Sequence, residues 1–413
     1  MNNTIKLAVA AALLAGASSA NAGIMIPAGD WTLDIGGIVN AYYTHTSTSG
    51  NDSTLLGAGP NALSGNTDDT DVSNITTGLL PNYLSVSGKT RQNDLDVGFT
   101  ISINPGSSTN QAGQQNGSVG SRTGNQENRQ AFLTFGDKSW GSIKVGKDLG
   151  IFASDAILND MTLLGVGSGA GALSGNTTTL GRIGTGFVYA DWKSQIAYSS
   201  PNWNGFSFTA GVTQGWNAIG FAGGVGSNNR GGAQPAFEGK ASYEWAGDFG
   251  GKVWVSGLSQ KLEGIAAGSA DERADAFDIG TTVNVAGFGL TGYYYKGDGI
   301  GQTVQFLGAL DASGKTRDSD GYYVQATYTL PGVGTKLGVS YGESELEGNG
   351  GESNSLVEDK MWTVGAYHPI TKHLNLVAEY SHVEHETGAS ANRSGVSEEG
   401  KAKTFALGAI LFF

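Results

Sequence analysis

Apolar and polar residues alternate along most of this 413-residue chain, in segments of about ten residues. The clearest segment covers residues 237–245, where odd positions are apolar or small and even positions are charged or hydroxylic. Successive side chains of a β-strand point to opposite faces, so one face can meet an apolar environment and the other water. We therefore expect Glu238, Lys240 and Glu244 to face a water-filled lumen. Two further segments repeat the pattern, residues 277–285 and 322–330.

Short turns and long polar loops separate the predicted strands alternately. The short turns, rich in Gly, Pro and Asn, are Gly88–Asn93, Gly136–Gly141, Pro201–Gly205, Gly247–Gly251, Ala286–Gly289, Pro331–Gly334 and Pro369–His373. The long loops are residues 45–80, 105–126, 148–193, 215–235, 262–273, 297–317, 343–357 and 387–400. Seven hairpins, with a first strand over Asp30–Thr44 and a last over Lys401–Phe413, give sixteen antiparallel strands. This arrangement is typical of an all-β transmembrane barrel.

The end of the chain distinguishes a barrel from a soluble β-sandwich or a secreted adhesin, which would also show short alternating strands. Its last strand places apolar residues on one face, and these are Phe405, Leu407, Ala409, Leu411 and Phe413. A free apolar strand edge invites aggregation, whereas pairing with the first strand closes a barrel and removes the edge. Both termini then lie on the side of the short turns, which faces the periplasm in bacterial barrels.

The longest connection, residues 148–193, is rich in Gly, Ser and Leu and has no strand pattern in its central part. Loops of this length in compact domains are usually functional or disordered. We expect this third long loop to fold into the lumen of the barrel and to narrow it.

Residues 1–22 have the parts of a secretory signal peptide: a basic residue, an apolar core and small residues before the expected cleavage site at Gly23. Cleavage would leave residues 23–413 as the barrel domain.

The formal net charge is −13, and it becomes −14 without the one lysine of the leader. An acidic chain with no basic stripe argues against a nucleic-acid partner. The chain has no cysteine, so no disulfide framework holds it.

The sequence contains no motif of an enzyme or of a cofactor site. Neither a G-x-S-x-G elbow nor the paired-histidine motif of zinc enzymes occurs. Acidic residues crowd the predicted loops, where we interpret most of them as a solvated surface. The alternative is that some bind divalent cations that bridge lipopolysaccharide phosphates, because hard oxygen ligands suit such ions. We expect no resident cofactor.

Several motifs in order resemble the Gram-negative trimeric general porins, over essentially the whole mature chain. NRQAFLTF followed by WGSIKVGKD is similar to the stretch that leads into the inward-folded third loop of that family, with Lys147 at the place of its usual arginine. GRIGTGFVYADWKSQIAYSSPNWNGFSF is similar to the return from that loop. The terminal Phe413 resembles the family's outer-membrane assembly signal, which implies the barrel-assembly machinery as a partner.

The resemblance also implies a pore constriction made of opposed charges. Arg129 and Arg182 match two arginines of the family's basic ladder on the barrel wall, and Asp160 matches an acidic residue of the loop that faces them. Asp155 and Lys144 are expected nearby. Opposed carboxylate and guanidinium groups create a transverse field, which sorts solutes by size, charge and dipole.

The orientation of Arg129 conflicts with strict alternation. If Ala131, Leu133 and Phe135 pointed to lipid, Arg129 would point there too, at a cost of about 2–4 kcal/mol near the middle of the bilayer. We favour Arg129 inward and Phe132 outward, with Leu133 and Phe135 beneath the third loop. An interfacial arginine near the outer rim is the alternative.

These features predict an outer-membrane channel for passive diffusion of small hydrophilic solutes and ions. Lipid and lipopolysaccharide would surround it, and the resemblance implies a homotrimer. A substrate-specific channel is one alternative, and a surface adhesin or structural barrel is another. Two departures from the family leave ion preference open: Leu163–Gly167 lacks an expected carboxylate, and Tyr83 stands at a ladder position in place of arginine.

Overall fold

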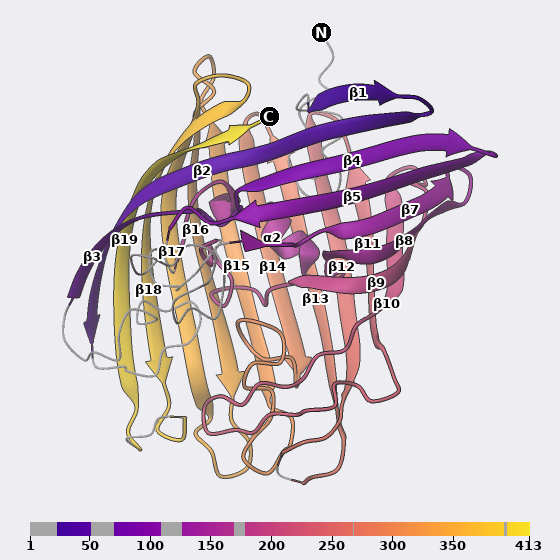
Figure 1. Cartoon of the computed structure of the whole chain (residues 1–413). Coiled ribbons are helices and arrows are strands. Elements are labelled where there is room, and N and C mark those ends of the chain that lie inside the picture. The colour runs from indigo at the N-terminus through magenta and orange to yellow at the C-terminus, as the bar shows by residue number, and fades with distance from the viewer. Residues whose placement is uncertain (1–22, 51–69, 109–125, 169–177, 267, 392–394) are drawn as a thin grey trace.

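The alternating segments form one closed β-sheet in the computed structural model of the chain (Figure 1). The structure describes residues 23–50, 70–108, 126–168, 178–266, 268–391 and 395–413. The predicted signal peptide, residues 1–22, lies outside this part of the chain. None of the helices in the described ranges combines the length and the apolar composition needed to span a bilayer.

Nineteen strands make up the sheet, and every registered pair of neighbours is antiparallel. Their bounds are β1 (Ile24–Ala28), β2 (Trp31–Gly50), β3 (Thr70–Thr76), β4 (Tyr83–Gln92), β5 (Leu95–Pro105), β6 (Gln126–Glu127), β7 (Ala131–Asp137), β8 (Gly141–Leu149), β9 (Trp192–Ser199), β10 (Phe206–Thr213), β11 (Ala236–Trp245), β12 (Phe249–Leu262), β13 (Glu272–Val285), β14 (Phe288–Asp298), β15 (Asp318–Thr329), β16 (Lys336–Glu347), β17 (Ser355–Pro369), β18 (Leu374–Thr387) and β19 (Glu398–Phe412). The last strand, β19, pairs with β2 from Gly400 opposite Gly50 to Phe412 opposite Ile38, and this pairing closes the barrel.

The nineteen strands form a wall of sixteen. β3 and β4 pair with successive parts of β2, and β6 and β7 both pair with β5, so each couple is one wall strand with a break. β1 is a short additional strand that pairs with the start of β2. The predicted sixteen-stranded antiparallel barrel is therefore confirmed. The strand β1 was not predicted, and the first strand extends to Gly50, six residues beyond its predicted end at Thr44.

Alternation sorts the side chains onto two faces of the wall. On β11, Phe237 and Tyr243 are exposed, whereas Glu238, on the opposite face, is buried. Exposed hydrophobic side chains continue across the neighbouring strands, for example Ile196, Val255, Phe277, Ile279, Leu290 and Val324. An apolar outer face with a polar inner face is the arrangement that a barrel needs in order to sit in a bilayer.

The orientation predicted around Arg129 is partly wrong. Arg129 lies in the break between β6 and β7, so its direction is not tied to the alternation of β7. Leu133 is 46% exposed and belongs to the apolar outer face, while the ring of Phe132 lies 4.8 Å from Lys144 Nζ. The prediction that Phe132 points outward and that Leu133 lies beneath the third loop is therefore wrong. The interrupted strand removes the conflict that led to that assignment.

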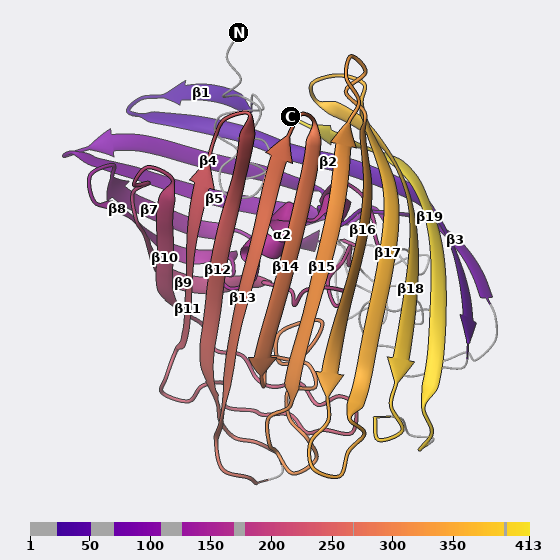
Figure 2. The same ribbon diagram turned by 180° about the vertical axis from the view of Figure 1, so that it is seen from behind.

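Loops fill a large part of the space that the wall encloses. The helix α2 (Ser154–Asn159) and the short 3-10 helix η4 (Met161–Leu164) belong to the β8–β9 loop, residues 150–191. Views from opposite sides show α2 within the ring of strands (Figures 1 and 2). One buried cluster combines loop side chains with wall aromatics, among them Phe187, Phe306, Leu310, Trp254, Tyr293 and Tyr323.

Candidate functional site

Glu238 on β11 holds the start of the β8–β9 loop. Its Oε2 accepts hydrogen bonds from the amides of Ile151 and Phe152, at 2.8 and 2.9 Å. Its Oε1 lies 2.5 Å from Lys193 Nζ, and both side chains are fully buried. A buried carboxylate is tolerated when donors and an opposite charge satisfy it. We had expected Glu238 to face open water, but it connects the loop to the wall because the loop packs over it.

Glu379 on β18 holds the loop again, on another part of the wall. Its Oε2 accepts hydrogen bonds from the amides of Val166 and Gly167, at 2.7 and 2.9 Å, and Tyr367 donates to its Oε1 at 2.6 Å. Glu379 is not among the residues predicted from the sequence. There it is only a carboxylate on the polar face of a predicted strand, and many other residues fit the same description.

Asp155 on α2 bridges two lysines of the wall. Its Oδ2 lies 3.1 Å from Lys240 Nζ, and its Oδ1 lies 2.6 Å from Lys252 Nζ. Glu244 lies 3.3 Å from the same Lys252 ammonium. The side chains of Lys240, Lys252 and Glu244 remain 28%, 18% and 45% exposed, so they border open space. Asp155, Lys240 and Glu244 are among the residues predicted from the sequence, whereas Lys252 is not.

The two lysines also set the charge state of Asp155. Burial alone would raise the pKa of this carboxyl, but the positive charges of Lys240 and Lys252 lower it below its ordinary value. Asp155 is therefore a carboxylate at neutral pH. We name Asp155, Lys240, Lys252 and Glu244 the α2 charge cluster.

Arg182 and Asp160 come together, but not across an open passage. Arg182 Nε lies 4.0 Å from Asp160 Oδ1, and both side chains are fully buried. The guanidinium donates to the carbonyl of Met361 at 3.0 Å and to the hydroxyl of Ser340, which belong to β17 and β16. Burial raises the pKa of Asp160, although the charge of Arg182 opposes the rise. This corrects the expectation of opposed groups at the narrowest section: the pair attaches the loop to the wall.

Arg129 and Lys144 have other partners. Arg129 Nε lies 2.9 Å from Glu127 Oε2, and its guanidinium carbon lies 5.8 Å from the ring centre of Trp192. Lys144 forms an ion pair with Asp148, four residues further along β8. The five residues proposed for the constriction therefore divide into four groups rather than one.

A cavity of about 240 Å³ adjoins Arg129. Most of its lining is apolar and includes Leu80, Ile157, Leu163, Leu180 and Val304. Val304 belongs to the loop between β14 and β15, whereas Ile157, Leu163 and Leu180 belong to the β8–β9 loop. Two different loops thus border the same interior space.

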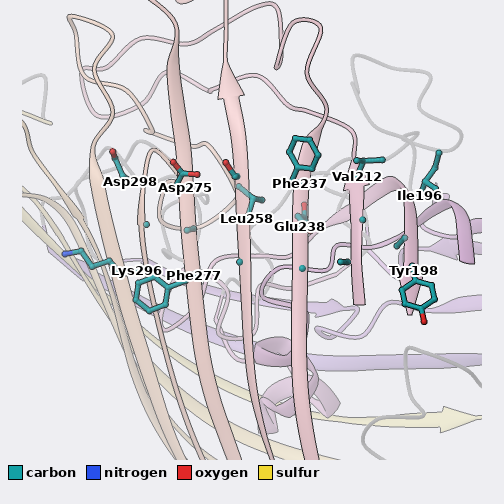
Figure 3. A pocket seen from close by; sticks show the side chains of 18 of the residues that line it. Ile196, Tyr198, Val212, Phe237, Glu238, Leu258, Asp275, Phe277, Lys296 and Asp298 are labelled. Carbon is teal, nitrogen blue, oxygen red and sulfur yellow. The ribbon is translucent and has the colours of Figure 1, made fainter. Parts of the chain in front are cut away.

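A larger hollow, of about 1020 Å³, lies on the apolar outer face and not in the lumen. Its floor follows small residues in register on three neighbouring strands, Ala210, Gly239 and Gly257. Figure 3 shows Ile196, Val212 and Phe237 of three consecutive strands along it. Because these side chains belong to the outer face, the hollow is no part of a passage for polar solutes.

Within the described ranges, no group of three or more histidine, aspartate or glutamate side chains is arranged to hold a metal ion. Several loop carboxylates have cationic partners instead. Asp271 lies 2.6 Å from Lys261 Nζ, and Glu272 lies 2.5 Å from Lys315 Nζ. These pairs account for part of the acidic loop surface.

A model of a protein family described as Gram-negative porin matches residues 8–388. Among solved structures, the outer membrane channel DcaP of Acinetobacter baumannii has a TM-score of 0.65 at 17% identity, covering 95% of this chain and 100% of that one. The anion-selective porin from Comamonas acidovorans has a TM-score of 0.59 at 16% identity, covering 93% and 100%. Salmonella typhi OmpF, in complex with daunomycin, has a TM-score of 0.55 at 17% identity, covering 93% and 100%. The search of curated proteins found no match.

Proposed function

Because the chain belongs to the Gram-negative porin family and is an outer-membrane channel for passive diffusion, we propose that its β8–β9 loop forms the constriction. The charged groups that sort solutes there are those of the α2 charge cluster. The observation that carries this proposal is the bridge from Asp155 to Lys240 and Lys252. It joins the loop to two wall strands by side chains that remain partly exposed.

The electrostatics of the cluster support a role in ion selection. A helix that carries a carboxylate is held against two partly exposed ammonium groups, so positive and negative charge lie together where the loop meets the wall. Charges in a confined, low-dielectric passage act more strongly on a solute than charges in bulk water. The two lysines and the two carboxylates balance in number, so the loss of one charge shifts the preference of the pore.

The test is the reversal potential of single channels in a KCl gradient, for the wild type and for Asp155→Asn. Removing the carboxylate leaves Lys240 and Lys252 less compensated, so the potential is expected to move toward anion selectivity. Lys252→Gln is expected to move it toward cations. Asp275→Asn is the matched control, because Asp275 lies on the outer face beside Phe277. Equal potentials in all four proteins would refute the proposed constriction.

We propose in addition that residues 1–22 are cleaved as a signal peptide, that Phe413 is read by the barrel-assembly machinery, and that the mature chain is a homotrimer surrounded by lipopolysaccharide. The trimer rests on the family resemblance. Native mass spectrometry of the purified outer-membrane protein gives both the subunit number and the mature N-terminus. A monomer that begins at Met1 would contradict these assignments.

A second candidate function is a substrate-specific channel. The observation that favours it is the largely apolar lining of the 240 Å³ cavity beside Arg129, which is unusual for a passage open to all small polar solutes. A specific channel would show concentration-dependent block of ion current by its solute, whereas a general porin would not.

A further inference from the structure

The loop between β14 and β15, residues 299–317, meets the β8–β9 loop inside the barrel. The amide of Tyr189 donates to the carbonyl of Thr303 at 2.9 Å, and the two loops form a short parallel bridge between Tyr189 and Val304. Backbone pairing of this kind holds two segments in a defined register. The interior therefore contains two paired loops rather than one.

A third loop joins the same assembly. In the β10–β11 loop, residues 214–235, the amide of Ile219 donates to the carbonyl of Phe306 at 2.9 Å. The amide of Gly308 donates back to the carbonyl of Ile219, also at 2.9 Å. The amide of Phe306 donates in turn to the carbonyl of Ile300 at 2.6 Å, so both backbone groups of Phe306 are hydrogen-bonded.

Lys193 connects all three loops through its ammonium group. Its Nζ lies 2.7 Å from Gln305 Oε1 and 2.5 Å from Glu238 Oε1. The rings of Trp216 and Phe306 lie 4.5 and 5.9 Å from the same nitrogen. Cation–π contacts gain strength where the cation is desolvated, as Lys193 is here. The Lys193–Glu238 pair therefore fixes the β14–β15 loop relative to the wall and to the β8–β9 loop.

The β14–β15 loop is also fixed to the opposite part of the wall. Gln302 Nε2 donates to the carbonyl of Ser344 at 2.9 Å and to Asp359 Oδ2 at 2.8 Å. Arg317, which is fully buried, donates to the carbonyl of Ala222 at 2.9 Å and pairs with Glu352. An arginine buried with this many partners is costly to displace. The loop is held at both ends as well as at its centre.

Phe306 has a strained backbone. Its φ is +68°, in the left-handed region that bulky residues rarely adopt, and its side chain is completely buried. Strain of this kind persists when the surrounding contacts determine the conformation, and it gathers at functional positions. A glycine would adopt the same backbone without strain, so the aromatic side chain is retained against a conformational cost.

We propose that the β14–β15 loop is a second lumen segment that sets the size limit of the channel, with the buried Phe306 and Lys193 as positioning residues that hold it in place. This inference rests on the proposed function, because a size limit has meaning only in a diffusion channel. The α2 charge cluster sorts solutes by charge, and the β14–β15 loop restricts the passage on its other side. Neutral solutes such as mono- and oligosaccharides carry no charge for the α2 charge cluster to sort, so their permeation rates report the size limit.

The test uses Phe306→Gly in proteoliposomes, with swelling rates measured for arabinose, glucose, sucrose and raffinose. The variant removes the ring and permits the positive φ, so the larger sugars are expected to enter faster relative to arabinose. Ala286→Gly is the matched control, because Ala286 also has a positive φ, +49°, but lies in the turn between β13 and β14. The control is expected to retain the wild-type ratios. Heat-modifiable migration in gels shows that each barrel is folded.

A second variant keeps the inference testable if Phe306→Gly does not fold. Gln305→Ala removes the contact to Lys193 and the hydrogen bonds from Gln305 Nε2 to the carbonyls of Tyr189 and Ala190, and leaves the wall pair of Lys193 with Glu238 intact. It is therefore expected to raise the swelling rate for raffinose relative to arabinose as well. Lys193→Arg preserves the positive charge. Its swelling rate for raffinose relative to arabinose is therefore expected to stay closer to the wild-type value than that of Lys193→Met. If every folded variant keeps the wild-type ratios of sugar swelling rates, the β14–β15 loop does not set the size limit. If Asp155→Asn still shifts the reversal potential in that case, the proposed constriction is unaffected.

Discussion

Val166 and Glu379 are 213 positions apart in the chain, yet the amide of Val166 donates a 2.7 Å hydrogen bond to Glu379 Oε2. The contact joins the β8–β9 loop to β18, while Glu238 on β11 holds the start of the same loop. Two carboxylates on different parts of the wall therefore determine the course of the loop. Each accepts two backbone amides, which is a favourable use of a buried charge.

Replacing Glu379 with alanine is expected to loosen the β8–β9 loop without opening the barrel. The amides of Val166 and Gly167 would each lose an acceptor, at about 1–3 kcal/mol per buried donor. Single-channel recordings should then show larger current fluctuations. Glu384→Ala on the same strand is the control, because Glu384 is 39% exposed and pairs with Lys401. Equally quiet channels would show that Glu379 does not restrain the loop.

The buried Arg182–Asp160 pair predicts a coupled effect. Arg182→Met is expected to leave Asp160 as an uncompensated buried charge, at a cost of about 3–5 kcal/mol. Adding Asp160→Asn to that variant should recover part of the loss, because the neutral amide needs no cation. The measurement is the temperature at which the folded form disappears in heat-modifiable gels. Strictly additive losses in the double variant would contradict the coupling.

The pH dependence of ion selectivity follows from Asp155, whose pKa lies below its ordinary value because Lys240 and Lys252 outweigh burial. A carboxyl with a lowered folded pKa contributes stability above its unfolded pKa and loses it as the pH falls through the folded value. The Asp155 contribution to selectivity should therefore be constant from pH 7 to about pH 4 and fall only below that range. Reversal potentials measured across this range check it. Asp155→Asn should lack this acid-dependent change.

Closure of the barrel depends on a glycine next to the terminal residue. Gly37 exchanges two backbone hydrogen bonds with Phe413, of 2.8 and 3.1 Å. A Cβ at Gly37 would lie 2.4 Å from the carbonyl oxygen of Tyr83 and 2.7 Å from the Phe413 ring. Gly37→Ala is thus expected to lower the yield of folded barrel in lipid vesicles. Gly292→Ala, where a Cβ meets no atom within 4 Å, should fold as the wild type does. If Gly37→Ala and the wild type gave equal yields of folded barrel, the neighbouring atoms of Tyr83 and Phe413 could move aside without loss of closure.

The wall of the barrel could be predicted from the sequence because its signal is local. Strand alternation repeats every two residues, and turn residues mark each reversal, so the pattern gives both the strands and their inner and outer faces. The break that reorients Arg129 could not be predicted, because Ser102 of the neighbouring strand exchanges hydrogen bonds with Gln130 there, and no local pattern marks it.

The content of the lumen was decided by tertiary structure. Asp155 was expected beside Arg182 and Asp160, and Lys240 and Glu244 only on the lumen face of their strand, but the folded loop brings Asp155 to Lys240 and Lys252. Arg182 and Asp160 were expected to face water, but they are buried because the loop packs against β16 and β17. Loops lack a periodic pattern, so their paths depend on a few hydrogen bonds and ion pairs between residues far apart in the chain. Those contacts arise once the closed wall has brought their partners around one enclosed space.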